Sequence, residues 1–288
     1  MNRWAFILVA VGLLVSCNKI EEVRVLDNVP PPDHTIDSST MQLYVYKAYV
    51  NLAGREPIGN EKAEALVVLR QDNFSWENRK QFMDMLLAKD EFYQNSYNVA
   101  RAEYLQNTDS IEIDGQIKLF ESLLAQPSYA PFFDLLRGEV NRLDTLQNTR
   151  QNLLNGQVDF KEMQRRCANN YFYDQINMGT ENFVISTFQN FLFRYPTAVE
   201  LTQSKLMADG QSAALFFNLG KNKNDYLRIF FNSDDYFEGQ VRYVFRKYLF
   251  REPSPAEIYF FADIYKSTNN YKSLLKDVLS RDEYAGLE

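Results

Sequence analysis

Histidine and cysteine are almost absent from this chain of 288 residues. The only histidine is His34, and the only cysteines are Cys17 and Cys167. A Ser-His-Asp triad, a Cys-His pair and a histidine-rich zinc site all need histidine in the folded part of the chain. His34 lies in a segment with the composition of a linker, so these sites are excluded. Catalysis would have to depend on carboxylates, lysine, tyrosine or serine, and we expect no enzyme activity and no cofactor.

Basic residues are also fewer than acidic ones. The chain has 31 lysines and arginines against 38 aspartates and glutamates. A protein that binds nucleic acid needs a basic face, so nucleic acid is not an expected partner. Apolar residues make up 45% of the chain, with 22 phenylalanines and 18 tyrosines. This composition supplies the core of a globular protein with one large or two small domains.

Long apolar runs are lacking, with one exception near the N-terminus. The run Trp4–Val15 follows Arg3 and ends at Ser16-Cys17. A basic start, a short apolar core and a small residue at the end are typical of a secretory signal. The sequence Leu14-Val15-Ser16-Cys17 resembles the lipobox of bacterial lipoproteins, which implies cleavage before Cys17 and lipidation of its sulfur. The alternatives are an ordinary signal peptide or a membrane-spanning anchor, but a spanning helix needs about 20 apolar residues.

We therefore expect residues 1–16 to be a lipoprotein signal peptide and residues 17–40 to be a lipidated, extended tether. The tether contains three consecutive prolines at 30–32 and shows no helical or alternating periodicity. The charged cluster at 19–22 resembles the acidic export signal of Bacteroidota surface lipoproteins; the alternative is an ordinary solvated linker. The expected location is the bacterial outer membrane, lipid-anchored, on either its periplasmic or its external face.

Lipidation of Cys17 would leave Cys167 as the only thiol, so no intramolecular disulfide could form. Cys167 ends a helical-looking run that begins at Asp159. We therefore expect a buried, inert thiol there rather than a nucleophile.

One motif, Arg-x-Pro-x-x-x-Glu, occurs three times, each time after an aromatic run with helical character. Each copy is followed downstream by an acidic-aromatic pair: Glu91-Phe92, Asp235-Tyr236 or Glu283-Tyr284. We interpret the three segments as divergent copies of one helical unit. The motif residues are Arg55, Pro57 and Glu61 in the first copy, Arg194, Pro196, Thr197 and Glu200 in the second, and Arg251, Pro253, Ser254 and Glu257 in the third.

The chemistry of the motif predicts a corner between two helices. An arginine in the last turn of the first helix would complement the helix dipole, and the proline would stop the helix. Thr197 and Ser254 have the spacing of N-caps in capping boxes, with Pro255 at the favoured first position. Ile58 cannot cap, so Asn60 is expected to cap in the first copy. The arginine and glutamate of a copy could also form an ion pair across the corner. The alternative is that they bind a ligand.

The segment Leu52-Ala53-Gly54-Arg55-Glu56-Pro57 resembles the Gly-Arg-Glu-Pro corner of a helical repeat domain that is common in bacterial secreted and surface proteins. A related corner occurs in phycobilisome linkers. Tyr195 replaces the glutamate in the second copy, so the likeness is weaker there. The resemblance carries no enzymatic activity and implies a helical module for protein contacts or cell-surface association.

Strand-like alternation is almost absent from the rest of the chain. Helical periodicity continues in residues 97–105, 117–124, 131–154 and 160–176, with turns at Asn155-Gly156 and Met178-Gly179. The predicted fold is therefore all-α: a multi-helix bundle or short solenoid of ten to twelve helices. Region 41–180 would contain the first motif copy, and region 181–288 the second and third.

Residues 110–121 have several features of a calcium-binding EF-hand loop. Ser110, Glu112 and Asp114 occupy loop positions 1, 3 and 5, glycine occupies position 6, and Glu121 occupies position 12. Serine is unusual at position 1, and glutamate is long for position 3. A polar connection between helices is the favoured interpretation, with a calcium site as the alternative.

Aromatic residues are abundant, which invites a sugar-binding hypothesis. However, Tyr243, Phe245, Tyr248 and Phe250 lie on a stretch with both faces apolar, a pattern typical of burial. The sequence thus predicts a non-catalytic, lipid-anchored accessory subunit that docks on an outer-membrane β-barrel or another surface protein. The alternative is a surface glycan-binding lipoprotein or a glycan hydrolase, which needs only two suitably spaced acids.

Overall fold

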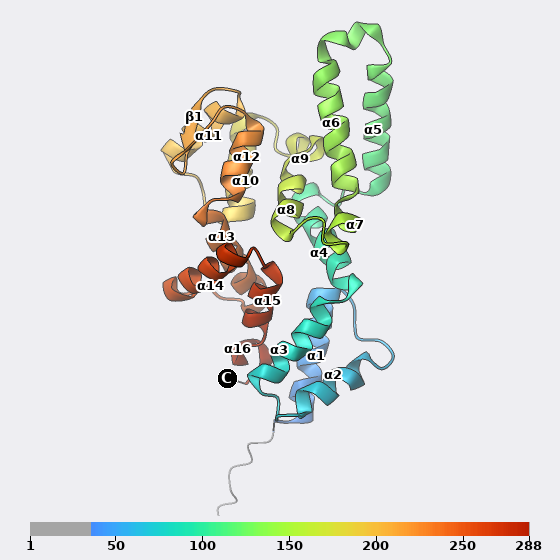
Figure 1. The fold of residues 1–288 in the computed structure, drawn as a ribbon, viewed down its shortest axis with the longest axis vertical. Coiled ribbons are helices and arrows are strands. Elements are labelled where there is room, and N and C mark those ends of the chain that lie inside the picture. The colour runs from blue at the N-terminus through green and yellow to red at the C-terminus, as the bar shows by residue number, and fades with distance from the viewer. Residues whose placement is uncertain (1–35, 288) are drawn as a thin grey trace, which may run out of the picture. The chain divides into compact units, whose positions relative to one another are not determined.

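The computed structural model describes residues 36–287, and every structural statement below concerns that part of the chain. Cys17, His34, the predicted signal peptide and most of the predicted tether lie outside the described residues. The described part contains sixteen α-helices, three short 3-10 or π-helical segments and one two-stranded antiparallel sheet (Figure 1). The all-α prediction is confirmed.

The helices follow one another with short connections. The first part of the chain contains α1 (Ser38–Ala53), α2 (Glu61–Arg70), α3 (Trp76–Leu87), α4 (Asp90–Leu105), α5 (Ser110–Leu124), η1 (Pro127–Phe132), α6 (Phe133–Gln147), α7 (Thr149–Leu154), α8 (Phe160–Ala168) and α9 (Tyr171–Ile176). The second part contains α10 (Thr180–Thr187), η2 (Phe188–Leu192), α11 (Ala198–Ala208), β1 (Ala213–Leu215), β2 (Asn218–Gly220), α12 (Lys223–Phe231), α13 (Asp234–Val244), η3 (Phe245–Leu249), α14 (Pro255–Thr268), α15 (Tyr271–Leu279) and α16 (Asp282–Ala285).

The helix count exceeds the predicted ten to twelve in part because two predicted runs are each interrupted. The run 131–154 divides into the end of η1, then α6 and α7. The run 160–176 divides at Asn170, whose side chain donates to the carbonyls of Arg166 and Cys167 and accepts from the amide of Tyr173. These bonds end α8 and begin α9, because an asparagine side chain competes with the helical backbone for partners.

One local boundary is wrong, and one element was not predicted. The predicted tether extends to residue 40, but α1 begins at Ser38, where the side chain of Asp37 accepts from the amide of Ser39. The hairpin of β1 and β2 was not expected. It pairs Leu215 with Asn218 and turns through the two residues between them.

Aromatic side chains fill the core, including Tyr44, Tyr173, Tyr226 and Tyr236. Phe245 and Tyr248 are buried as expected, whereas Phe250 is 83% exposed, contrary to expectation. Phe250 lies outside the core because it follows the last turn of η3, where the chain reverses direction.

The last helices pack against the first ones. The hydroxyl of Tyr44 on α1 donates to the carbonyl of Leu279 at 2.9 Å. The buried guanidinium of Arg79 on α3 donates to the carbonyl of Ser280 at 2.8 Å and pairs with Asp282. Contacts between α15 and α3 and between α16 and α1 complete this arrangement. The two ends of the described chain therefore share one core.

Candidate functional site

Each motif arginine lies just beyond a helix rather than in its last turn, so that prediction is wrong. The residue before the arginine adopts a left-handed backbone and reverses the chain. These residues are Gly54 with φ 72°, Phe193 with φ 56° and Phe250 with φ 56°. A left-handed residue is a common helix terminator, because it turns the chain away from the helix axis. The arginine then points back across the corner.

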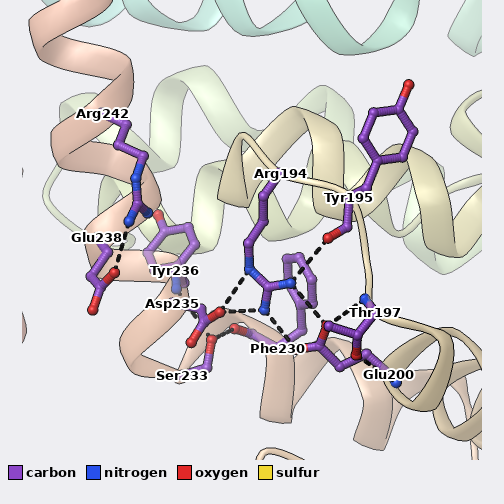
Figure 2. Close-up of polar contacts among 10 residues, drawn as sticks. All are labelled: Arg194, Tyr195, Thr197, Glu200, Phe230, Ser233, Asp235, Tyr236, Glu238 and Arg242. Atoms are coloured by element: carbon purple, nitrogen blue, oxygen red, sulfur yellow. Dashed lines mark hydrogen bonds and ion pairs between the residues drawn. The ribbon is translucent and has the colours of Figure 1, made fainter. Parts of the chain in front are cut away.

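Arg194 in the second corner binds two carboxylates at once (Figure 2). Its Nη1 and Nη2 donate to the two oxygens of Glu200 at 2.9 and 2.6 Å. Its Nε donates to Asp235 at 2.9 Å, and its Nη2 also contacts Asp235. The carbonyl of Tyr195 accepts from Nη1 at 3.1 Å, and the Tyr195 ring points away from the guanidinium. All five N–H groups of this guanidinium are therefore used within the protein.

The third corner has the same arrangement, and the first differs only in that its arginine makes a single bond to the second carboxylate. Arg251 donates to Glu257 at 3.0 and 2.9 Å and to Glu283 at 2.6 and 2.9 Å. Arg55 donates to Glu61 at 2.7 and 2.9 Å and to Glu91 at 2.6 Å. The expected ion pair across each corner is present. The sequence also showed the acidic-aromatic pairs, but it did not reveal that their acids bind the arginines.

The capping boxes predicted for the second and third corners are present. The hydroxyls of Thr197 and Ser254 accept from the amides of Glu200 and Glu257, whose carboxylates accept from the cap amides. The first corner differs from its prediction, since the Asn60 side chain makes no capping bond. Instead, Glu61 accepts from the amide of Ile58 at 2.9 Å, which is only half of a capping box.

These contacts keep the corner glutamates ionised. The hydrogen bonds from Arg251 are the largest influence on Glu257 and lower its pKa from 4.5 to about 2. Burial by itself would raise the pKa of Glu200, but bonds from Arg194 and Thr197 outweigh it and lower that pKa to about 2. The bonds from Arg55 likewise lower the pKa of Glu61. Since the guanidinium N–H groups of Arg194 and Arg251 are all bonded internally, as are four of the five of Arg55, the geometry of the corners suits a structural role.

Comparisons with protein-family models, with curated proteins and with solved structures found no match. Within residues 36–287, no helix combines the length and the apolar character needed to cross a membrane.

Both interpretations of residues 110–121, as a calcium-binding loop and as a polar connection between helices, are wrong. Ser110, Glu112, Asp114 and Glu121 all lie on one continuous helix, α5. The carboxylate of Asp109 accepts from the amides of Ile111 and Glu112, and Glu112 reaches back to the amide of Asp109 at 2.8 Å. This capping box starts a helix where a calcium loop would need irregular backbone. The described residues contain no cluster of three or more histidine, cysteine or acidic side chains suited to a metal ion.

Cys167 is fully buried on α8, as expected. Burial raises the pKa of its thiol to about 12, so the reactive thiolate is disfavoured at neutral pH.

Two features escaped the sequence analysis. The first is the turn between β1 and β2, where Phe216 and Phe217 both have positive φ, 48° and 61°. The signal was an uncharged stretch from Gly210 to Gly220 with two adjacent phenylalanines. The second is a hollow of about 320 Å³ lined in part by Arg101 and Arg150. No sequence signal indicates it, because its residues come from separate helices.

Proposed function

We propose that this protein is a lipid-anchored, non-catalytic interaction subunit of a complex at the bacterial outer membrane. The lipobox-like segment ending at Cys17 supports the anchor. The three corners support a helical scaffold built from divergent copies of one unit, because each joins a motif arginine to the same two kinds of carboxylate. The partner is expected to be a β-barrel or another protein at the same membrane.

The observation that carries the proposal is a pair of exposed, uncharged tips on an acidic protein. The helical tip, residues 122–133, joins α5 to α6 and contains η1, in which no residue is buried. Tyr129 and Phe132 are 37% and 55% exposed there. The strand tip, residues 210–220, contains Phe217, which is fully exposed, and Leu219, which is 79% exposed. Figure 1 draws both tips at its upper end.

The backbone of the strand tip strengthens this argument. A two-residue hairpin turn with both φ values positive favours Asn-Gly, whereas Phe217 holds a bulky side chain in a conformation that L-residues avoid. Each such residue costs roughly 1–3 kcal/mol. The ring of Phe216 packs near Phe188, with centroids 6.2 Å apart, but the ring of Phe217 makes no comparable contact among the described residues. An exposed aromatic side chain kept at a cost to stability suits a contact with another protein.

Site-specific crosslinking in the cells that make the protein would test this function. A photoreactive residue would replace Phe217 or Phe132 in the full-length chain, with the exposed Lys62 on α2 as the control position. We expect crosslinks from the two tips to one membrane protein, and none from position 62. Equal crosslinking from all three positions, or a clean monomer that binds or cleaves a glycan, would favour the alternative function.

Phe217→Gly provides a matched variant for the same experiment. Glycine adopts the left-handed backbone without strain, so we expect the free energy of unfolding to rise by roughly 0.5–1 kcal/mol while partner recovery falls. If Phe217→Gly is more stable but recovers less partner, Phe217 contacts the partner and is not needed for the fold. Unchanged recovery of the partner would show that the strand tip is not part of the interface.

The anchor is tested independently. Mass spectrometry of the N-terminal peptide should show acyl chains on Cys17, and Cys17→Ala should release the protein from membranes. An unmodified Cys17 in the membrane-extracted protein would refute the lipid anchor without bearing on the two tips.

A further inference from the structure

A hollow of about 320 Å³ lies between α4, α5 and the junction of α6 with α7. Its lining is mostly polar and includes two arginines, Arg101 from α4 and Arg150 from α7. Ile113 of α5 and the buried Tyr97 provide the apolar part of the lining. Because three separate parts of the chain converge here, the hollow belongs to the folded body rather than to one loop.

The two arginines are unusual in this protein. Most arginines in residues 36–287 have a carboxylate within 4 Å. The exceptions in that part of the chain are Arg70, Arg101 and Arg150, and two of these three line the same hollow. Most guanidinium groups of this acidic chain are paired with a carboxylate. Two unpaired guanidinium groups that line one hollow therefore create a local excess of positive charge.

Neutral acceptors hold Arg101 in place. Its Nε donates to the carbonyl of Thr108 at 2.7 Å, and its Nη2 donates to the carbonyl of Asn107 at 3.1 Å. Its guanidinium carbon lies 5.9 Å from the centre of the Tyr97 ring. These two bonds use only part of the five N–H groups of the guanidinium and do not cancel its charge.

Arg150 is positioned in a similar way. Its Nη1 donates to the side-chain oxygen of Gln94, whose own amide nitrogen donates to Asn98 at 2.9 Å. The side chain is thus directed by a neutral amide, and its remaining N–H groups are available to a ligand.

The acids closest in sequence to the hollow already have partners. Asp109 accepts from backbone amides at the start of α5, and Glu112 accepts from the amide of Asp109. Asp114 accepts from Gln147 at 2.8 Å. Asp90 and Glu91 line a neighbouring hollow together with Arg150, and Glu91 pairs with Arg55. None of these acids forms an ion pair with Arg101 or Arg150 within 4 Å, and no acid among residues 36–287 lines the hollow itself.

From this arrangement we propose that the hollow binds an oxyanion, a carboxylate or phosphate group carried on a small hydroxylated molecule. Guanidinium groups bind both oxyanions through paired, charge-assisted hydrogen bonds. The side chains of Gln94, Ser110 and Gln147 line the same hollow and suit hydroxyl groups. Its volume is at the lower end of the range for small-ligand sites. The inference does not depend on the interaction role proposed above.

Calorimetric titration of the full mature protein with three probes would test the site. Glucuronate supplies a carboxylate on a sugar, glucose 6-phosphate supplies a phosphate, and glucose is the uncharged control. We expect both anions to bind, more weakly as salt concentration rises, and glucose not to bind. The anion that binds more tightly shows whether the site prefers a carboxylate or a phosphate group. Binding of glucose as strong as that of glucuronate, or no binding of either anion, would overturn the proposal.

Arg150→Gln is the decisive variant because Arg150 is exposed and makes no bond to the backbone. Loss of one charge-assisted contact should weaken anion binding by about tenfold or more and leave the melting temperature unchanged. Arg137→Gln, at an exposed arginine of α6 outside the hollow, should leave anion binding unchanged. Arg101→Gln should weaken binding too, with some loss of stability. Equal affinity in wild type and Arg150→Gln would refute the assignment.

Discussion

At the scale of single residues, the left-handed position before each motif arginine differs most among the three corners. Gly54 adopts φ 72° without strain, and a Cβ there would lie 2.5 Å from Oδ1 of Asn95. That asparagine donates to the carbonyls of Asn51 and Leu52 at the end of α1. Phe250 adopts a similar backbone with its side chain exposed, whereas Phe193 stacks on Tyr243 with centroids 5.4 Å apart.

Substitutions at these positions should therefore have opposite effects. Gly54→Ala should lower the free energy of unfolding by roughly 1–3 kcal/mol, through backbone strain and the clash with Asn95. Phe250→Gly should raise it by roughly 0.5 kcal/mol, because relief of left-handed strain exceeds the added freedom of the unfolded chain. Urea denaturation midpoints would measure both effects. A loss of stability in Phe250→Gly would mean that its exposed ring makes a contact in solution.

At the scale of elements, the corner arginine connects three parts of the chain: the preceding helix, the next helix and a later helix start. An arginine that acted only on a helix end would contribute about 0.3–1 kcal/mol. Arg251 instead pairs with both Glu257 and Glu283, whose carboxylate side chains are only 17% and 20% exposed, and Arg281 gives Glu257 a second contact at 3.1 Å. Removal of Arg251 would leave the poorly solvated Glu283 without an ion pair and Glu257 with Arg281 alone.

The corners should make stability depend on acid. The folded pKa of Glu257 is about 2, below its ordinary value of 4.5, so its contribution is complete above pH 4.5 and disappears as the pH falls towards 2. Arg251→Gln should lower stability at pH 7 by roughly 1.5–3 kcal/mol and reduce the pH dependence between 4.5 and 2, with a remainder that comes from Ser254 and Arg281. Unfolding measured across this range would check both. An unchanged acid slope in the variant would show that Arg251 does not set this pKa.

Ser254→Ala is the matched control for that variant. It removes the hydroxyl that caps α14 but leaves the ion pairs in place, so it should cost about 0.5–2 kcal/mol at pH 7. Most of the acid slope should remain, because the Ser254 side chain lowers the pKa of Glu257 less than Arg251 does.

At the scale of the whole molecule, the end of the chain completes the core formed by its beginning. Tyr284 of α16 is 2% exposed, and its ring lies 5.8 Å from that of Tyr44. Its hydroxyl accepts from Asn51 of α1 at 2.9 Å, and its carbonyl accepts from Lys47 at 3.2 Å. Unfolding of the last helix should therefore expose the first ones.

Tyr284→Ala should lower the stability of the N-terminal helices as well as that of the C-terminal ones. We expect a loss of roughly 3–5 kcal/mol from the cavity and the lost bonds. Trp76 on α3 is the sole tryptophan after the predicted signal peptide, so its fluorescence reports on the N-terminal region. The fluorescence and far-UV circular dichroism transitions should shift together, whereas Tyr259→Ala, at an exposed position, should shift neither. A shift in circular dichroism alone would contradict a shared core.

The sequence by itself determined the helical class and the capping chemistry of the second and third corners. A capping box depends on residues three positions apart. The boxes of Thr197 with Glu200 and of Ser254 with Glu257 could therefore be predicted without knowledge of the fold. The buried thiol of Cys167 was readable for a similar reason, since burial follows from the apolar pattern of its own segment. The calcium hypothesis is wrong because Asp109 caps α5, so that residues 110–121 form a helix and not a loop.

Only the tertiary structure decided which groups far apart in sequence meet. The partners of the corner arginines, Glu91, Asp235 and Glu283, lie on other helices, as do the residues around Arg101 and Arg150. Side-chain partners at such separation depend on how the helices pack, which local propensity does not specify. The strained turn at Phe217 could not be predicted from the sequence either. Two adjacent phenylalanines favour a strand, whereas in the structure the chain reverses direction at this pair.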